Sequence, residues 1–157
     1  MRAVPAETRA VEDGWADGRY GAFWGRYGAA GLLIQNIRGE VLLQLRASWC
    51  HHPGTWGIPG GARESGESAL GAALRECREE HGFPVDDLTV IGEHTLDLGY
   101  WSYVTFVARY PGEWPVSIRT AEADDARWIP LASMPLLPLH PGLAGTWRHL
   151  REILQTS

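Results

Sequence analysis

Three glutamates lie close together near the end of one predicted helix, in the stretch GIPGGARESGESALGAALRECREEHGF (57–83). At about 100° per residue, Glu76, Glu79 and Glu80 share one helix face about 100° wide. Each like-charged pair at i, i+3 or i, i+4 costs about 0.2–0.5 kcal/mol, and the negative end of the helix dipole adds to this cost. The arrangement therefore predicts a cation among the carboxylates, and oxygen ligands of this kind suit Mg²⁺ or Mn²⁺.

A glycine-rich loop, WGIPGG, leads into this helix. Pro59 stiffens the loop, and Gly60 and Gly61 let the backbone approach a ligand or a metal closely. Taken alone, the loop is also typical of a tight turn, and the glutamates alone are typical of a solvated acidic surface. The two features together favour a metal site that handles phosphate groups, because Mg²⁺ is usually bound by few carboxylates together with substrate phosphates.

The stretch from Gly61 to Phe83 resembles the Nudix box, G-x5-E-x7-R-E-U-x-E-E-x-G-U, in which U is bulky and apolar. All polar and glycine positions of that pattern are present. Cys77 stands where an aliphatic residue is usual, and a buried cysteine packs as a small hydrophobe. The resemblance implies an α/β fold, an α/β/α sandwich with a mixed β-sheet and a loop–helix catalytic motif. It also implies an enzyme that hydrolyses a phosphoanhydride bond in a nucleoside diphosphate linked to another moiety, with Mg²⁺ or Mn²⁺.

Carried over by position, the resemblance implies a role for most polar residues of the box. The metal ligands would be three glutamate side chains and one backbone carbonyl, those of Glu76, Glu79, Glu80 and Gly61. Arg75 would orient a metal-binding glutamate, with Glu79 favoured. Glu67 would support the loop–helix geometry, through Arg75 or through a metal-bound water. The general base would be Glu79 or Glu76, and both stay open.

Further candidates lie outside the box, in loops and at strand ends. Many family members use an acid from a later loop as a metal ligand or base, and the candidates here are Glu113, Glu122, Asp124 and Asp125. Arg46 and Arg63 could bind substrate phosphates, since a guanidinium can donate to two oxygens at once. Aromatic residues beside the loops that could stack on a base or a sugar are Trp56, Trp49, Tyr100 and Trp101. For each of these residues, an ordinary surface or packing role is the alternative.

Apolar alternation and turn residues predict strands on both sides of the box helix. Their ranges are 26–36, 40–47, 88–98, 102–110 and 126–131. The box helix begins after Ser65 or Ser68 and ends at Gly82, and a second helix over 142–154 carries one apolar face. Residues 1–22 lack this periodicity and are predicted to be an N-terminal extension, with a single domain over 23–157. Such an extension could reach a second copy of the chain, so a homodimer is one expectation.

Composition and charge exclude several classes of function. A net charge of −5 argues against broad binding to nucleic acid or to an anionic membrane. The longest apolar run, around 103–108, is far shorter than a membrane span, and no signal-peptide core is seen, so we expect a cytoplasmic enzyme with a small-molecule substrate. The stretch CHH (50–52) lacks the ligand spacing of a zinc motif.

Two other functions are compatible with the same fold. One is a binding or regulatory module that keeps the fold without the reaction, which the loss of a box glutamate would favour. The other is an isomerase of prenyl diphosphates, which needs its own catalytic cysteine and acid in specific loops, and Cys50 lies in a loop of roughly that region. The complete set of box glutamates favours the hydrolase over both.

Overall fold

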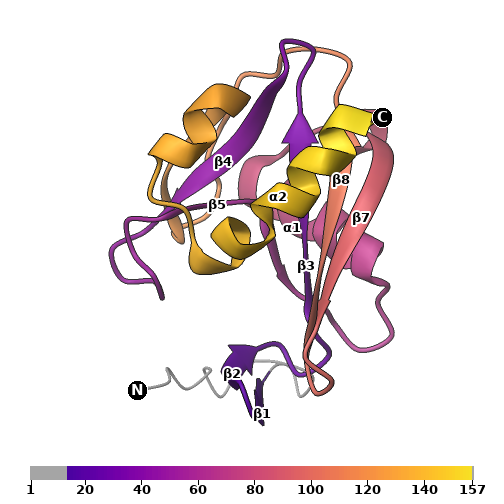
Figure 1. Ribbon diagram of the computed structural model, residues 1–157, viewed down its shortest axis with the longest axis vertical. Helices are drawn as coiled ribbons and strands as arrows, with labels where there is room; N and C mark the ends of the chain where they lie inside the picture. Colours follow the sequence, from indigo (N-terminus) through magenta and orange to yellow (C-terminus); the bar gives the residue numbers. More distant parts are fainter. Residues whose placement is uncertain (1–13, 157) are drawn as a thin grey trace.

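The computed structural model describes residues 14–156, which form a mixed α/β structure with one main sheet between two helices. Figure 1 shows helix α1 (Ala69–His81) on one side of the sheet and α2 (Pro141–Thr156) on the other. The sheet has seven strands: β3 (Ala29–Gln35), β4 (Glu40–Arg46), β5 (Trp56–Gly57), β6 (Gly60–Ala62), β7 (Thr89–Asp97), β8 (Ser102–Arg109) and β9 (Ala123–Pro130). This is the layered α/β/α arrangement with a mixed sheet that the sequence predicts.

Strand β3 lies at the centre of the sheet and positions the glycine-rich loop. It runs parallel to β8, whereas β7 pairs antiparallel with β8, and β9 and β5 pair antiparallel with β4. β3 and β4 separate after a single residue pair, Gln35 with Val41, and β6 pairs with the first half of β3. The Leu32 amide donates to the Pro59 carbonyl, with 2.9 Å between N and O. Gly60 and Gly61 are therefore held as part of the sheet.

Side chains alternate between the two faces of the sheet, and each face builds a separate hydrophobic core. On the α1 side, Leu32 and Leu42 pack with the small residues of the helix. On the α2 side, Leu33 and Leu43 pack with Leu150 and its neighbours. The two cores hold the two helices in fixed positions on the same strands.

The ends of α1 follow the capping rules that the sequence indicates. Of the two predicted N-caps, Ser68 is the one that caps the helix, and its Oγ accepts a hydrogen bond from the Gly71 amide at 3.0 Å. Gly82 ends the helix in the left-handed conformation, with φ of 66°, and its amide donates to the Arg78 carbonyl. A 3₁₀ turn, η1 (Val85–Asp87), follows the helix, and η2 (Leu131–Leu136) precedes α2.

Two strands begin at other residues than the sequence predicts. The predicted strand over 26–36 begins only at Ala29, because Gly25 and Gly28 adopt φ of 102° and 89° and make a turn there. The predicted strand over 126–131 begins earlier, at Ala123, because its pairing with β4 continues to Arg46 through a register shift. Both differences arise at strand ends, where pairing rather than periodicity decides the boundary.

A β-hairpin precedes the main sheet, made of β1 (Trp15–Gly18) and β2 (Gly21–Trp24). Most of the predicted extension, residues 1–13, lies outside the described residues, and the hairpin crosses the predicted boundary between 22 and 23. Figure 1 shows the hairpin at the end of the sheet where β3 begins. None of the helices formed by residues 14–156 combines the length and the apolar character needed to cross a membrane.

Candidate active site

Glu80 is the most deeply buried of the three helix glutamates, with 5% of its surface exposed. Its Oε1 accepts a hydrogen bond from the Gly60 amide at 3.0 Å, and its Oε2 accepts one from Gln44 Nε2 at 3.4 Å. Burial raises the pKa of Glu80 to about 8, and the neighbouring Glu76 carboxylate contributes to the shift. The fold thus places an acid in a site that favours its neutral form unless positive charge is added.

Glu76 lies about one helix turn before Glu80 and faces the glycine-rich loop. A Cβ added to Gly61 would lie 2.6 Å from Glu76 Cδ, so only glycine leaves room for this carboxylate. Burial raises the pKa of Glu76 to about 7, with Arg75 opposing the shift and Glu79 adding to it. Glu79 is the outermost of the three, with 58% of its side chain exposed.

Arg75 connects the glycine-rich loop to the helix. Its Nε and Nη2 donate to the two carboxylate oxygens of Glu67 at 2.8 and 2.9 Å, and Nη2 also donates to the Ala62 carbonyl at 3.0 Å. Its Nη1 donates to Glu76 at 2.9 Å and to Glu79 at 3.4 Å. Arg75 therefore contacts Glu76 more closely than Glu79, and its guanidinium lowers the pKa of Glu67.

Glu76 and Glu79 line an open cavity of about 290 Å³ beside β6. The residues that line it are Trp24, Gly60, Gly61, Ala62, Glu64, Arg75, Glu76, Glu79 and Glu122. Of the four later-loop acids, Glu122 is the one that reaches this cavity. Glu113 instead pairs with Arg38 at 3.3 Å, and Asp125 pairs with Arg127 at 2.7 Å.

The donor set suits a hard divalent cation, although it is not a finished coordination site. Carboxylate oxygens and a backbone carbonyl are the ligands that Mg²⁺ and Mn²⁺ prefer. Burial and repulsion from neighbouring carboxylates raise the pKa values of Glu76 and Glu80, and added positive charge would favour their ionised forms. Among residues 14–156, no three His, Cys, Asp or Glu side chains converge in a geometry that would hold a metal. Glu76 and Glu79 instead accept hydrogen bonds from Arg75, and Glu80 accepts hydrogen bonds from Gly60 and Gln44.

The structure does not bring the three substrate-binding candidates into this cavity. Arg46 Nε donates to the His51 carbonyl at 2.6 Å, and Arg63 donates through Nε and Nη2 to the Glu67 carbonyl at 3.1 and 2.8 Å. Trp56 packs against the core on the α2 side. Arg63 thus stabilises the loop that carries Glu67, and Trp56 belongs to the packing of the opposite face.

A buried polar chain behind Glu80 was not indicated by any sequence motif. His81, with no exposed surface, places Nδ1 2.7 Å from the Ser117 carbonyl and Nε2 2.8 Å from Gln44 Oε1. Because a carbonyl only accepts, Nδ1 must carry the proton in that contact. Gln44 in turn reaches Glu80. These contacts join positions 36 and 37 residues apart, which no local pattern predicts.

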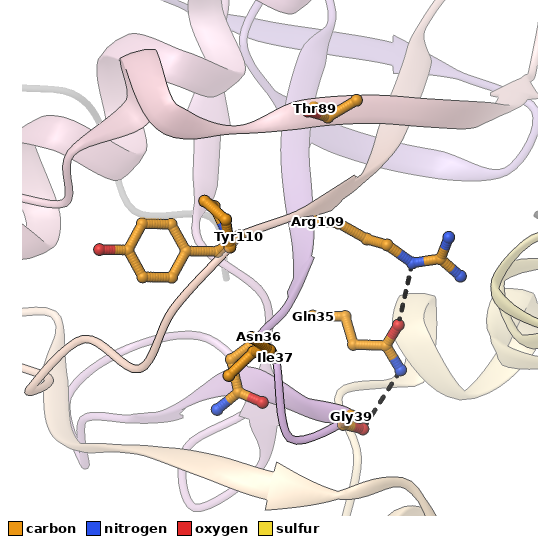
Figure 2. A pocket seen from close by; sticks show the side chains of 8 residues that line it. Gln35, Asn36, Ile37, Gly39, Thr89, Arg109 and Tyr110 are labelled. Carbon is orange, nitrogen blue, oxygen red and sulfur yellow. Dashed lines mark hydrogen bonds between the residues drawn. The ribbon is translucent and has the colours of Figure 1, made fainter.

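A second cavity, of about 390 Å³, lies at the other end of β3. Figure 2 shows two of its polar side chains hydrogen-bonded: Arg109 donates to Gln35 Oε1 at 3.3 Å, and Gln35 donates to the Gly39 carbonyl at 3.2 Å. The residues that line it are Gln35, Asn36, Ile37, Gly39, Thr89, Arg109, Tyr110 and Pro111. They include no carboxylate, so this cavity lacks the features that distinguish the cavity beside α1.

Comparison with known proteins matches most of the chain to one family, the one that the box motif resembles. A family model described as NUDIX domain matches residues 25–150. The chain is 42% identical over 160 residues to a Mycobacterium tuberculosis protein named "Putative 8-oxo-dGTP diphosphatase 3", covering 95% of this chain and 73% of that protein. It is also similar to the crystal structure of RenU, a Nudix hydrolase from M. smegmatis, with a TM-score of 0.78 and 39% identity over 91% of this chain and 95% of that one. A C. elegans Ap4A hydrolase structure matches at a TM-score of 0.68 and 26% identity, covering 82% of this chain and 99% of that one.

Proposed function

The chain belongs to the Nudix hydrolase family, and we propose that it hydrolyses a phosphoanhydride bond in a nucleoside diphosphate derivative with Mg²⁺ or Mn²⁺. The observation that carries this proposal is a cavity that Glu76 and Glu79 line together with Gly61, with Glu80 buried against the adjacent Gly60 amide. When all three glutamates are ionised, balancing them needs more positive charge than Arg75 supplies. A divalent cation with its bound phosphates would supply that charge.

The residues that would hold the cation are Glu76, Glu79, Glu80 and the carbonyl of Gly61. When bound, the metal would neutralise phosphate oxygens and lower the pKa of an attacking water. Arg75 and Glu67 would keep the glycine-rich loop against the helix while the glutamates change partners. The proton of the water would pass to a carboxylate oxygen of Glu76 or Glu79, both of which line the cavity.

The first substrate to test follows from the M. tuberculosis relative, whose printed name refers to 8-oxo-dGTP. The name of the C. elegans structure adds a dinucleoside polyphosphate, Ap4A. These compounds share a phosphoanhydride bond next to a nucleoside, which is the common chemistry that the proposal requires. A panel of 8-oxo-dGTP, dGTP, ADP-ribose and Ap4A therefore samples the substrate class.

The test is phosphate or pyrophosphate release and product analysis on this panel, with Mg²⁺, with Mn²⁺ and with EDTA. We expect turnover that needs the metal, and a loss of about 100-fold or more in kcat for Glu76→Gln and for Glu80→Gln. Glu152→Gln, a matched change at an exposed position of α2, should behave as the wild type. Turnover that persists in EDTA, or in both box variants, would contradict the proposal.

One observation favours a second candidate, a binding module that does not turn over its ligand. Both Glu76 and Glu79 are paired with Arg75, so the cation site is not preformed among the described residues. In that case calorimetry would detect binding of a nucleotide, while no product would form on any substrate with either metal. Metal-dependent turnover on one substrate of the panel would exclude this candidate.

A further inference from the structure

We infer that Trp24 is a specificity-determining residue that stacks on the nucleobase of the substrate, which makes base-containing compounds the preferred ligands of this site. The inference rests on the proposed function for the phosphate end of the cavity. It concerns a residue just before the region that the family model matches, residues 25–150. Trp24 is the last residue of strand β2 of the hairpin.

Trp24 lines the same cavity as three of the four metal-ligand candidates. These candidates are Gly61, Glu76 and Glu79. Among the described residues that line the cavity, Trp24 is the aromatic one. An indole offers neither a ligand for a divalent cation nor a positive charge for a phosphate. What it adds beside such a site is a flat apolar surface, which suits a planar base attached to the phosphates.

The backbone fixes Trp24 against the glycine-rich loop. Gly25, with φ of 102°, approaches Ala62 so closely that an added Cβ would lie 2.8 Å from Ala62 Cβ. Its amide donates to the Gly14 carbonyl at 2.7 Å, and the Arg63 amide donates to the Gly28 carbonyl at 2.9 Å. The residue after Trp24 is thus held to the start of the hairpin at Gly14, and it lies against Ala62, which directly follows the candidate ligand Gly61.

The rest of the hairpin is docked on the β7–β8 connection, so Trp24 is not on a free arm. The Tyr100 hydroxyl donates to the Gly21 carbonyl at 2.8 Å, and the Phe23 ring stacks on Trp101 with 4.3 Å between centroids. Trp15 packs its ring edge-on to Trp24, with centroids 5.4 Å apart and planes at 72°. A ring held in this way loses little freedom when a base stacks on it, which favours binding.

Three of the four aromatic residues that the sequence suggested for stacking make other contacts. Tyr100 and Trp101 hold the hairpin in place, and Trp49 donates its Nε1–H to the Ala121 carbonyl at 3.1 Å. The residue brought into the cavity is one that sequence reasoning did not single out. The signal for it would have been the Trp-Gly pair at 24–25, since a glycine with positive φ permits the close approach that places its neighbour.

The experiment compares Trp24→Ala, Trp24→Phe and Tyr20→Ala, the last being a matched aromatic deletion at an exposed site of the same hairpin. Steady-state kinetics would be measured on 8-oxo-dGTP and dGTP and on inorganic tripolyphosphate, which has no base. Stacking on one base corresponds to about a 5- to 150-fold effect. We expect Trp24→Ala to raise KM for the nucleotides within that range, with a smaller change in kcat and none in KM for tripolyphosphate. Trp24→Phe should recover most of the nucleotide affinity.

A binding measurement separates failure of this inference from failure of the proposed function. Calorimetry with α,β-methylene-ATP and Mg²⁺ reports affinity without turnover at the α–β linkage, because the methylene bridge there cannot be hydrolysed. Loss of affinity in Trp24→Ala, with Tyr20→Ala like the wild type, supports the stacking even if no substrate turns over. Unchanged nucleotide affinity in Trp24→Ala would overturn the inference, as would an equal loss for tripolyphosphate in the kinetic assay or no binding by the wild type. Circular dichroism would confirm that the variants are folded.

Discussion

Helices α1 and α2 pack on opposite faces of the same sheet, yet they bury very different residues. The buried positions of α2 are Leu143, Trp147, Leu150 and Leu154, which recur on one helix face. The buried positions of α1 are Ala72, Ala73, Cys77, Glu80 and His81. One helix buries only apolar side chains, whereas the other buries small ones together with an acid and a histidine.

This contrast separates stabilisation from chemistry. Full burial of one large apolar side chain contributes about 1.5–3 kcal/mol, so α2 stabilises the fold directly. The alanines of α1 contribute less, but they bring the helix close enough to the sheet for Glu80 to reach Gly60 and Gln44. In α1, therefore, an acid stands at a buried position where an apolar side chain would stabilise the fold more.

The largest expected difference between the helices is in activity. Glu80→Gln keeps the shape of the side chain and removes its charge, so we expect kcat to fall about 100-fold or more. Without metal the same variant should be as stable as the wild type or more so, because the buried site disfavours the ionised acid. Assays of kcat and of Tm with and without Mg²⁺ would measure both effects. A stable variant with full activity would remove the distinction between the helices.

The matched change in α2 should have the opposite profile. Leu150→Ala opens a cavity at a fully buried position, and we expect it to lower the free energy of unfolding by about 2–5 kcal/mol. Below its melting temperature the variant should keep kcat and KM close to those of the wild type. Urea denaturation and steady-state kinetics would test this. A specific loss of kcat in well-folded Leu150→Ala would mean that α2 also acts on the site.

An intermediate effect is expected for Gln44→Leu, which removes the polar link between His81 and Glu80. The change leaves His81 Nε2 and one oxygen of Glu80 without a partner, and we expect a loss of stability of about 1–3 kcal/mol. The affinity for Mn²⁺, followed by electron paramagnetic resonance, should fall as well, because Glu80 loses one of its two hydrogen-bond donors. Leu42→Ala, a change on the same strand with no polar contact to Glu80, serves as the control for stability alone. A Gln44→Leu variant with unaltered metal affinity would show that the polar contacts from His81 through Gln44 to Glu80 only support the fold.

The smallest expected effect is a pH dependence of stability that arises at the start of α2. His140 Nδ1 accepts a hydrogen bond from the Gly142 amide at 3.0 Å, which requires that nitrogen to be unprotonated. Burial and the neighbouring Arg46 charge lower the pKa of His140 to about 4. Because the native pKa lies below the unfolded value, this contribution is complete above about pH 6.5 and is lost as the pH falls toward 4.

We therefore expect Tm to fall between about pH 6.5 and 4, and to fall less in His140→Asn, which can still accept the same hydrogen bond as an N-cap. Thermal melts of the two proteins over this range would measure the difference. Identical pH profiles would show that protonation of His140 does not weaken the start of α2.

The sequence alone determined much of the fold and the identity of the box. The periodicity of α2, the Ser68 and Gly82 caps and the common face of Glu76, Glu79 and Glu80 are local properties, set by helix geometry and capping chemistry. The strand ranges followed from alternation, apart from their ends. Local spacing is sufficient for these features because the interacting residues are within a few positions of one another.

Only the tertiary structure decided how the glutamates differ and what surrounds them. The contacts of Glu80 with Gly60 and Gln44 and the position of Trp24 at the cavity all join residues far apart in the chain. Equal spacing on a helix cannot say which carboxylate a sheet will cover. That depends on where β3 and β4 separate and on how closely the alanines of α1 let the helix approach, which are properties of packing rather than of sequence pattern.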